Sequence, residues 1–271
     1  MTNPWRRDYR PLAISHRGHS VEYPENTRIA YEKAIELGTE MIECDVNLTR
    51  DGKLVMIHDW KLDRTTSGSG RVSDHTWAEI QSLDAGAKFG PQFAGAKVPT
   101  TEDTLLFYRE AGILGCFEVK GENEAESKRI ASALVDLMIK HQTFDYAFMS
   151  SYNHPAMALA KAKAPELMLA PERLPDDAPP DPPEAVRQAR ALGSAVLQYQ
   201  YTVLTAEVMD ALHAADIAVW SWSTTNEQSM RDSIALQADA LMGDDVRLMV
   251  SLLDQLRPRN ANPKGPLRET V

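Results

Sequence analysis

The sequence is poor in cysteine, with only Cys44 and Cys116 among its 271 residues. Two cysteines form at most one disulfide bond, which excludes a disulfide-stabilised scaffold, and a reducing compartment would leave both as thiols. Cys44 lies between two acidic residues in an apolar run, so its side chain should face away from theirs if the run is a strand. We expect both cysteines to be small residues of the core.

The sequence also lacks long hydrophobic runs. Its first ten residues, MTNPWRRDYR, contain no apolar stretch of the length that a signal peptide has. No later run approaches the roughly 18 apolar residues of a membrane-spanning helix. We therefore expect a soluble, cytoplasmic protein without a membrane span.

An excess of positive charge is missing as well, because 29 Lys and Arg residues face 39 Asp and Glu residues, for a formal net charge of −10. Such a charge repels nucleic acid, which is therefore not an expected partner. It also repels a small phosphate-bearing substrate unless local cations or a metal ion reverse the field. Any phosphate chemistry must be arranged locally. No exposed stripe is distinctive enough to predict an oligomeric state.

What the chain does contain is a regular alternation of short apolar runs with longer stretches of helical period. The fractions of hydrophobic (43%) and charged (25%) residues are those of an ordinary globular protein. Alternation of this kind predicts an α/β fold with a parallel sheet, and eight strands are the number of a TIM (β/α)8 barrel. We assign residues 1–257 to a single barrel domain. The expected strands centre on residues 11–16, 41–46, 114–119, 146–150, 167–170, 195–198, 218–222 and 240–242.

Three segments depart from this alternation of strands and helices. Residues 60–98 are rich in Gly, Ser and Thr, with one short helical piece at residues 76–83, and we expect a small insertion over the barrel mouth. Residues 171–183 (PERLPDDAPPDPP) are too rich in proline for a helix or an inner strand and should form an exposed loop. Residues 258–271 should be a frayed tail.

A β-hairpin is predicted after the second strand. Residues 54–58 (LVMIH) follow that strand after only five polar residues, TRDGK, whose Asp-Gly pair is a strong turn signal. With a two-residue loop at that pair, facing residues have numbers that sum to 103. Asp45 would then lie opposite His58, which returns the histidine to the level of the acidic residues on the second strand.

The first helix is predicted to begin at Asn26-Thr27, which can cap it, and to stop at Gly38. For Asn26, a cap and a contact with a ligand are equally compatible with the sequence.

Unusual polar residues gather at the ends of the first three barrel strands, where the catalytic groups of barrel enzymes lie. Those that stand two apart in one strand share a face of it. Three carboxylates and two cations in one small space are costly to bury unless they bind something. Oxygen donors without a Cys-His set favour a hard cation such as Mg²⁺ or Ca²⁺ over zinc. These residues are His16, Arg17, Glu43, Asp45, Glu118 and Lys120.

Two histidines, His16 and His58, would flank such a cation. Cleavage of a phosphodiester needs charge neutralisation at the phosphoryl oxygens, a base for the nucleophile and an acid for the leaving alkoxide, and the predicted site offers all three. Two other classes stay open. A lyase or isomerase of phosphorylated sugars would not need two histidines across one metal, and a non-enzymatic barrel with a relict site should have lost at least one of these residues.

Several motifs together resemble the glycerophosphodiester phosphodiesterase family. They are HRG and PENT (residues 16–18 and 24–27), ECDV (43–46), IHDWKLDRTTSGSG (57–70), FEVK (117–120) and WSWSTTN (220–226). The resemblance runs through nearly the whole predicted barrel. It implies a TIM barrel with an insertion after the HD motif, and hydrolysis of a small phosphodiester to an alcohol and glycerol 3-phosphate, as in the breakdown of deacylated phospholipids.

The same resemblance implies roles for single residues. It implies that Glu43, Asp45 and Glu118 bind a divalent cation and that His16 and His58 act as acid and base. It also implies that Arg17 and Lys120 contact the phosphate and that Trp222 stacks against the glycerol or head group.

Two departures from the family pattern concern the rim of the mouth. The chain has Gly243-Asp244-Asp245 where relatives often have Thr-Asp before a proline, and WSWSTTN where WTVN is usual. Substrate preference is therefore open. The main rival is a lysophospholipase D or sphingomyelinase D-like activity on acylated lipids, which would require an apolar channel, whereas residues 60–98 show only scattered Phe89 and Phe93.

Overall fold

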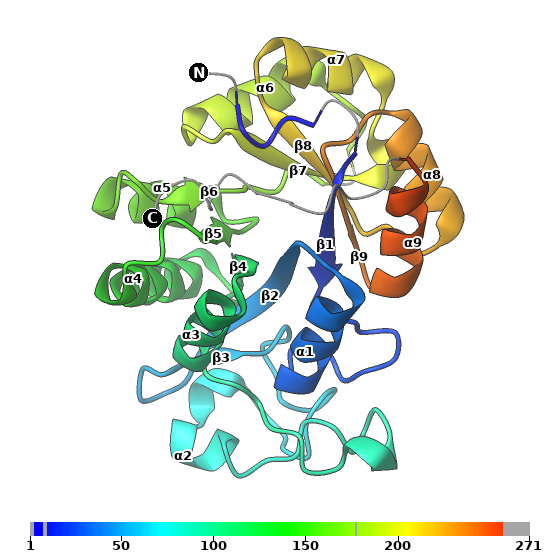
Figure 1. The fold of residues 1–271 in the computed structure, drawn as a ribbon. Coiled ribbons are helices and arrows are strands. Elements are labelled where there is room, and N and C mark those ends of the chain that lie inside the picture. The colour runs from blue at the N-terminus through cyan, green and yellow to red at the C-terminus, as the bar shows by residue number, and fades with distance from the viewer. Residues whose placement is uncertain (1–2, 8–9, 177, 257–271) are drawn as a thin grey trace.

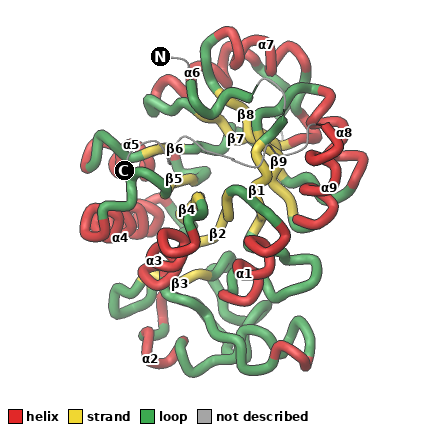
Figure 2. Tube along the Cα trace, in the orientation of Figure 1, coloured by secondary structure: helices red, strands yellow, loops and turns green. Residues whose placement is uncertain are grey.

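In the computed structural model, which describes residues 3–7, 10–176 and 178–256, eight parallel strands form a barrel (Figures 1 and 2). They pair in the order β6-β5-β4-β2-β1-β9-β8-β7. All eight predicted strands and the predicted TIM-barrel fold are confirmed. The strands are β1 (Leu12–His16), β2 (Met41–Leu48), β4 (Leu114–Val119), β5 (Ala147–Ser150), β6 (Met168–Leu169), β7 (Val196–Gln200), β8 (Ala218–Trp222) and β9 (Ala240–Gly243).

Eight helices lie outside this ring of strands, one in each connection and one after β9 (Figure 1). They are α1 (Arg28–Leu37), α3 (Thr101–Ala111), α4 (Glu124–His141), α5 (His154–Lys163), α6 (Pro182–Ala191), α7 (Ala206–Ala214), α8 (Glu227–Ala235) and α9 (Val246–Leu256). Each strand therefore ends at the same rim of the barrel, so side chains from distant parts of the sequence meet there. The predicted tail, residues 258–271, lies outside the described residues. Within the described part of the chain, no helix combines the length and the apolar character that crossing a membrane requires.

Two hydrophobic cores follow from the alternation of side chains along the strands. One fills the barrel interior, where Trp5 packs edge-on against Phe148 and Trp220, with ring centroids 4.7 and 6.4 Å away. The other lies between the strands and the surrounding helices, where it forms two separate clusters. Cys116 belongs to the inner core and Cys44 to the outer one, and both are buried free thiols, as predicted.

The barrel closes between β6 and β7 through a short seam. One parallel bridge joins Glu172 to Gln198, whose N–H donates to the carbonyl of Pro171 (2.8 Å) and whose carbonyl accepts from the N–H of Arg173 (2.9 Å). The predicted exposed loop over residues 171–183 is therefore wrong at both ends. Its first three residues are buried in the seam, because a proline lacks an N–H but still offers a carbonyl, and its last two prolines begin α6, where the missing N–H costs nothing.

The predicted hairpin exists, but its register is wrong by one residue. Strand β3 (Leu54–Met56) pairs antiparallel with β2 so that the numbers of facing residues sum to 102. The turn has three residues rather than two, with Gly52 at a φ of 84° and the N–H of Thr49 donating to the carbonyl of Lys53 (2.9 Å). Consequently Ile57, not His58, faces Asp45, and its N–H donates to the Asp45 carbonyl (3.0 Å).

Residues 60–98 extend from the end of this hairpin and occupy the lower part of Figure 1. They contain two single-turn 3₁₀ segments, Val72–Asp74 and Pro91–Phe93, and the short helix α2 (Trp77–Ile80), which Thr76 and Glu79 close with a reciprocal capping box. Side chains from this segment and the hairpin make a small core of their own, which comprises Val55, Ile57, Leu62, Val72, Ile80, Ala85 and Val98.

Candidate active site

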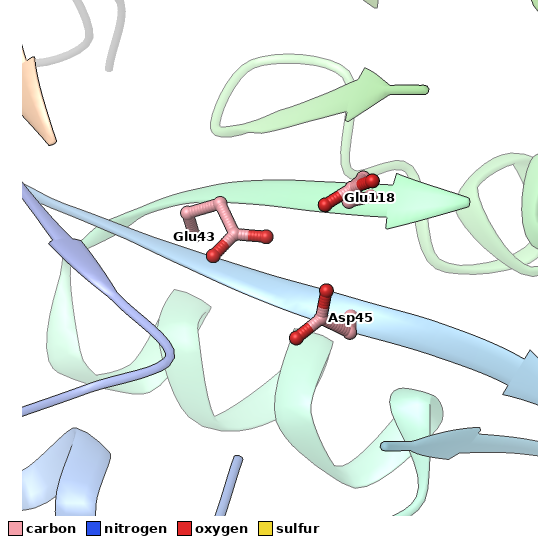
Figure 3. A group of neighbouring side chains, drawn as sticks. All are labelled: Glu43, Asp45 and Glu118. Carbon is pink, nitrogen blue, oxygen red and sulfur yellow. The ribbon is translucent and has the colours of Figure 1, made fainter. Parts of the chain in front are cut away.

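Three buried carboxylates meet at the rim of the barrel. Glu43 and Asp45 are two residues apart on β2, and Asp45 is the register partner of Glu118 on the neighbouring strand β4. One oxygen atom from each of the three lies within 4.8 Å of the other two. Figure 3 shows the carboxyl groups turned toward the space between the two strands. The alternation of side chains along parallel strands produces this cluster, as the sequence predicted.

Glu43 has no partner of its own in the cluster. Among the described residues, none makes a hydrogen bond to either of its carboxyl oxygens, although both are buried. Burial, reinforced by Asp45 and Glu118, raises the pKa of Glu43 well above its usual range. A buried carboxyl group without a donor is unfavourable, so this position is complete only when a positive charge or a proton is added.

Two cations balance the other carboxylates. The Nζ atom of Lys120 lies 2.7 Å from Glu118 Oε1 and 3.2 Å from Asp45 Oδ1, and Nε of Arg17 lies 3.0 Å from Asp45 Oδ2. Burial alone would raise the pKa of Asp45, but Lys120 and Arg17 hold it well below its usual range. These two cations therefore favour the ionised form of Asp45.

Asn26 orients Asp45 instead of capping α1. Its Nδ2 donates to Asp45 Oδ2 (2.6 Å), and its Oδ1 accepts from the backbone N–H of Asp45 (3.2 Å) and from the hydroxyl of Tyr31 (3.1 Å). The N-cap position belongs to Thr27, which makes no capping bond because its hydroxyl donates to the carbonyl of Pro24. The prediction that the side chains of Asn26-Thr27 cap this helix is therefore wrong, because neither makes a capping hydrogen bond. The predicted stop at Gly38 is confirmed.

Both predicted histidines lie beside the cluster and are held in the same manner. Nδ1 of His16 lies 2.6 Å from Asp244 Oδ1, and Nδ1 of His58 lies 2.7 Å from Asp59 Oδ1. A carboxylate only accepts, so each Nδ1 carries a hydrogen and each Nε2 is free to accept or donate a proton. Nε2 of His16 is 3.9 Å from Glu43 Oε2.

Asp244 is a site residue that sequence reasoning missed. It follows β9, accepts from the hydroxyl of Ser20 (3.2 Å) as well as from His16, and lies 228 positions along the chain from that histidine. Burial opposes ionisation, but the bond from His16 lowers the pKa of Asp244. Its position at the carboxyl end of the last barrel strand was the available signal, because the catalytic groups of barrel enzymes lie at strand ends.

One arginine from the residue 60–98 segment connects the two sides of the site. Arg64 donates from Nε and Nη2 to Asp59 (2.7 and 3.0 Å) and from Nη1 and Nη2 to Glu25 (2.7 and 2.8 Å). Glu25 in turn accepts from Arg17 (3.1 Å), which contacts Asp45. A continuous series of alternating charges thus runs from His58 to the carboxylate cluster.

A cavity of about 640 Å³ opens beside the cluster, between the 60–98 segment and the loops that follow β4 and β5. Its wall includes His58, Glu118, Lys120, the half-exposed Trp60 and Tyr152. Trp222, the last residue of β8, stands at the same rim, with its ring centroid 6.0 Å from that of Tyr152. All eight side chains that the sequence singled out therefore lie at one end of the barrel.

Comparison with known proteins points to one family. Residues 16–248 match the glycerophosphoryl diester phosphodiesterase family. A glycerophosphodiester phosphodiesterase of Caldanaerobacter subterraneus subsp. tengcongensis is 32% identical over 242 residues, covering 89% of this chain and 97% of the relative. One from Bacillus altitudinis is 30% identical over 250 residues, covering 90% and 98%.

The fold has similar counterparts among solved structures. An Oleispira antarctica phosphodiesterase, solved in complex with the product sn-glycerol-3-phosphate, aligns with a TM-score of 0.82 and 26% identity over 90% of this chain and 97% of that one. A glycerophosphodiester phosphodiesterase from Agrobacterium tumefaciens aligns with a TM-score of 0.76 over 89% and 99% of the two chains, at 24% identity.

Proposed function

The chain belongs to the glycerophosphoryl diester phosphodiesterase family, and on that premise we propose that it hydrolyses small glycerophosphodiesters, such as glycerophosphocholine and glycerophosphoethanolamine, to an alcohol and sn-glycerol 3-phosphate. The observation that carries this proposal is the pair of histidines, each held at Nδ1 by a carboxylate, on either side of the three-carboxylate cluster.

The proposal includes a divalent cation, Mg²⁺ or Ca²⁺, held by Glu43, Asp45 and Glu118. These residues fit such an ion because they offer oxygen donors within one small space and because both Glu43 oxygens lack a partner among the described residues. When bound, the cation supplies charge neutralisation at the phosphoryl oxygens.

Arg17 and Lys120 are assigned to the phosphate in the same proposal. Both carry their positive charge within 3.2 Å of the cluster carboxylates, so a phosphate held at the cluster would lie beside both of them. Together with a bound divalent cation, the guanidinium and ammonium groups would outweigh the three carboxylates, so the site would attract a phosphate despite the net charge of −10.

The two histidines divide the proton transfers. In the first step one histidine takes a proton at its Nε2 from the glycerol hydroxyl that attacks phosphorus, and the other donates a proton from Nε2 to the oxygen of the leaving alcohol. In the second step the two exchange roles as water opens the resulting cyclic phosphate to glycerol 3-phosphate. Asp244 and Asp59 keep the Nδ1 hydrogen in place and stabilise the imidazolium that forms on each. Both histidines have the same arrangement, so the geometry alone does not distinguish the acid from the base. The pH dependence of kcat in single variants of His16 and His58 would assign the two roles.

The cavity beside His58 is our proposed space for the alcohol. Trp60 and Tyr152 give it an aromatic surface, and its volume of about 640 Å³ leaves room for the alcohol. Phe89 and Phe93 pack on each other, with centroids 5.5 Å apart, and neither lines this cavity. These two phenylalanines therefore give the lysophospholipase D or sphingomyelinase D alternative no support at this cavity.

The decisive experiment measures release of sn-glycerol 3-phosphate from glycerophosphocholine and glycerophosphoethanolamine. The protein is first treated with EDTA, and Mg²⁺, Ca²⁺ or Mn²⁺ is then restored. We expect no release after EDTA and recovery with at least one ion. Metal-independent release would contradict the cation assignment, and cleavage of lysophosphatidylcholine alone would move the substrate to acylated lipids.

A further inference from the structure

The strand that carries two of the three cluster carboxylates carries an asparagine on the same face. Every second side chain of β2 packs into the outer core, namely those of Ile42, Cys44, Val46 and Leu48. The side chains between them face the other way, toward the barrel interior, as those of Glu43 and Asp45 do. Asn47 is the next member of this inward-facing series and is only 3% exposed. It therefore lies one step beyond Asp45 toward the mouth of the barrel.

The side-chain amide of Asn47 holds the turn that carries His58. Its Nδ2 donates to the carbonyl oxygens of Ile57 (2.8 Å), Asp59 (3.2 Å) and His58 (3.4 Å). The amide has two N–H hydrogens, so the three carbonyl groups share them. The chain from Ile57 to Asp59 is thus curved around one side chain that extends from β2.

This turn has little other backbone support. The ladder between β2 and β3 ends at Met56, and the N–H of Ile57 makes the last backbone bond to β2. Within the part of the chain that the structure describes, neither His58 nor Asp59 forms a hydrogen bond with another backbone group. Backbone carbonyl groups away from water are nearly always paired, so Asn47 supplies the donor that the ladder no longer provides.

The other contacts of the turn act on its side chains. Asp59 holds Nδ1 of His58 (2.7 Å), and Arg64 in turn donates to Asp59 (2.7 and 3.0 Å). The first contact joins two neighbours within the turn, and the second comes from a later segment of the chain. Neither ties the turn to β2. Asn47 makes that connection, from the face of β2 that also presents the cluster carboxylates.

We propose that Asn47 is a positioning residue for the reaction, which sets the distance between His58 and the carboxylate cluster. A strand is a more rigid support than a loop, and β2 would then carry both the metal ligands and the group that places the proton-transferring imidazole. Asn47 acts through the backbone of the turn and need not touch the substrate. The inference rests on the proposed function, since it concerns a step in which His58 transfers a proton.

The first test is a double-mutant cycle of Asn47→Ala with His58→Ala, measured as kcat on glycerophosphocholine with saturating cation. We expect Asn47→Ala alone to lower kcat by about tenfold to a hundredfold, because a reacting group displaced by about 1 Å loses that much, with KM and cation affinity nearly unchanged. In the His58→Ala background the same change should alter kcat by less than about twofold, since no imidazole is left to place.

Thr39→Val is the matched control. The Thr39 hydroxyl also donates to backbone carbonyl groups, those of Ala13 (3.0 Å) and Met41 (2.8 Å), but at the opposite end of β2. Its loss should lower stability without lowering kcat. Equal losses of kcat in the Asn47 and Thr39 variants, or a full loss in the His58→Ala background, would assign the effect to folding and overturn the inference. Asn47→Asp keeps the shape but not the donor, and it decides if the alanine variant does not fold.

Crystal structures of the native protein and of Asn47→Ala test the inference without turnover. The backbone of His58 should move relative to Asp45 by about 0.5 Å or more in the variant. His16, which Asp244 holds from another part of the barrel, should keep its place. A His58 that does not move would overturn the inference. Displacement of His58 in a protein that does not hydrolyse glycerophosphocholine would instead reject the proposed function and leave Asn47 as the residue that fixes the turn.

Discussion

Asp244 Oδ1 lies 2.6 Å from Nδ1 of His16, although the two residues come from opposite ends of the described chain. The contact joins the end of β1 to the residue after β9, and these two strands are neighbours in the barrel. The last connection of the fold therefore fixes the ring orientation of a histidine that the first strand supplies.

Asp244→Asn should lower kcat by about 10²-fold or more while changing KM little, because a neutral amide does not stabilise the imidazolium charge and can present its NH2 to Nδ1, which favours the wrong tautomer. Steady-state kinetics on glycerophosphocholine measures this. Asp245→Asn is the matched control, because Asp245 accepts from the N–H of Leu248 in the first turn of α9 and asparagine preserves that bond. Equal effects of the two changes would show that Asp244 acts through local folding.

His58→Ala should reduce turnover by about 10²- to 10⁴-fold, the usual contribution of a general acid or base, and leave metal affinity and folding nearly unchanged. Activity, metal titration and thermal unfolding are measured on the same preparation. His141→Ala serves as the control, since that histidine pairs with Glu102, outside the site. Turnover comparable to the native protein would remove His58 from the mechanism.

Glu43→Gln should leave the metal-free protein as stable as before or make it more stable, because the substitution removes a buried carboxyl group that lacks a partner within the described residues. The native protein should gain about 2.7 kcal/mol at a cation concentration a hundredfold above Kd, and the variant much less. Thermal unfolding with EDTA tests the predicted stability of the metal-free proteins, and thermal unfolding with added cation tests the predicted difference in stabilisation. Glu36→Gln, at an exposed ion pair with Lys33, should change neither quantity.

Arg64→Leu should weaken the acid dependence of stability. Hydrogen bonds from Arg64, opposed by partial burial, lower the pKa of Asp59 from 3.8 to about 2. Because the folded pKa is the lower one, ionised Asp59 stabilises the fold above about pH 4, and this contribution is lost as the pH falls toward about 2. The variant should lose less stability in that window, as measured by urea unfolding.

The same variant should lower kcat, since Asp59 then orients His58 less well. Arg231→Leu removes a comparable exposed arginine pair with Glu227 on α8 and should affect neither acid stability nor kcat. An unchanged pKa of Asp59 by NMR in the Arg64 variant would contradict this account.

The strands and the carboxylate cluster were predictable because they depend on local rules. A run of apolar residues with its polar residues at the end marks a barrel strand, and a spacing of two places Glu43 and Asp45 on one face. The meeting of β2 with β4 needs one further step, that strands adjacent along the barrel sequence pair in parallel. Each step uses information contained within a few residues.

The hairpin register was not predictable from the Asp-Gly pair, since that pair occurs in turns of two and of three residues. A change of one residue moved Ile57 opposite Asp45. His58 nevertheless reaches the site because it follows the end of β3, where the chain is no longer bound by the ladder.

Asp244, Asn26 and Glu172 were missed for a different reason. Their roles arise from contacts between segments far apart in sequence: Asp244 with His16, Asn26 with Asp45, and Glu172 with Gln198 across the seam. In the sequence alone each resembles an ordinary turn or cap residue. Only the assembled barrel distinguishes a carboxylate that orients a histidine from one that is merely solvated.

The backbone of Glu172 forms the bridge that closes the barrel between β6 and β7, and its side chain is buried. Only this bridge and its two hydrogen bonds join the backbone of β6 to that of β7 within the described residues, whereas the neighbouring strands pair over several residues. Local opening of the barrel should therefore begin at this seam, so the amide hydrogens of Arg173 and Gln198 should exchange with solvent faster than those between β4 and β5.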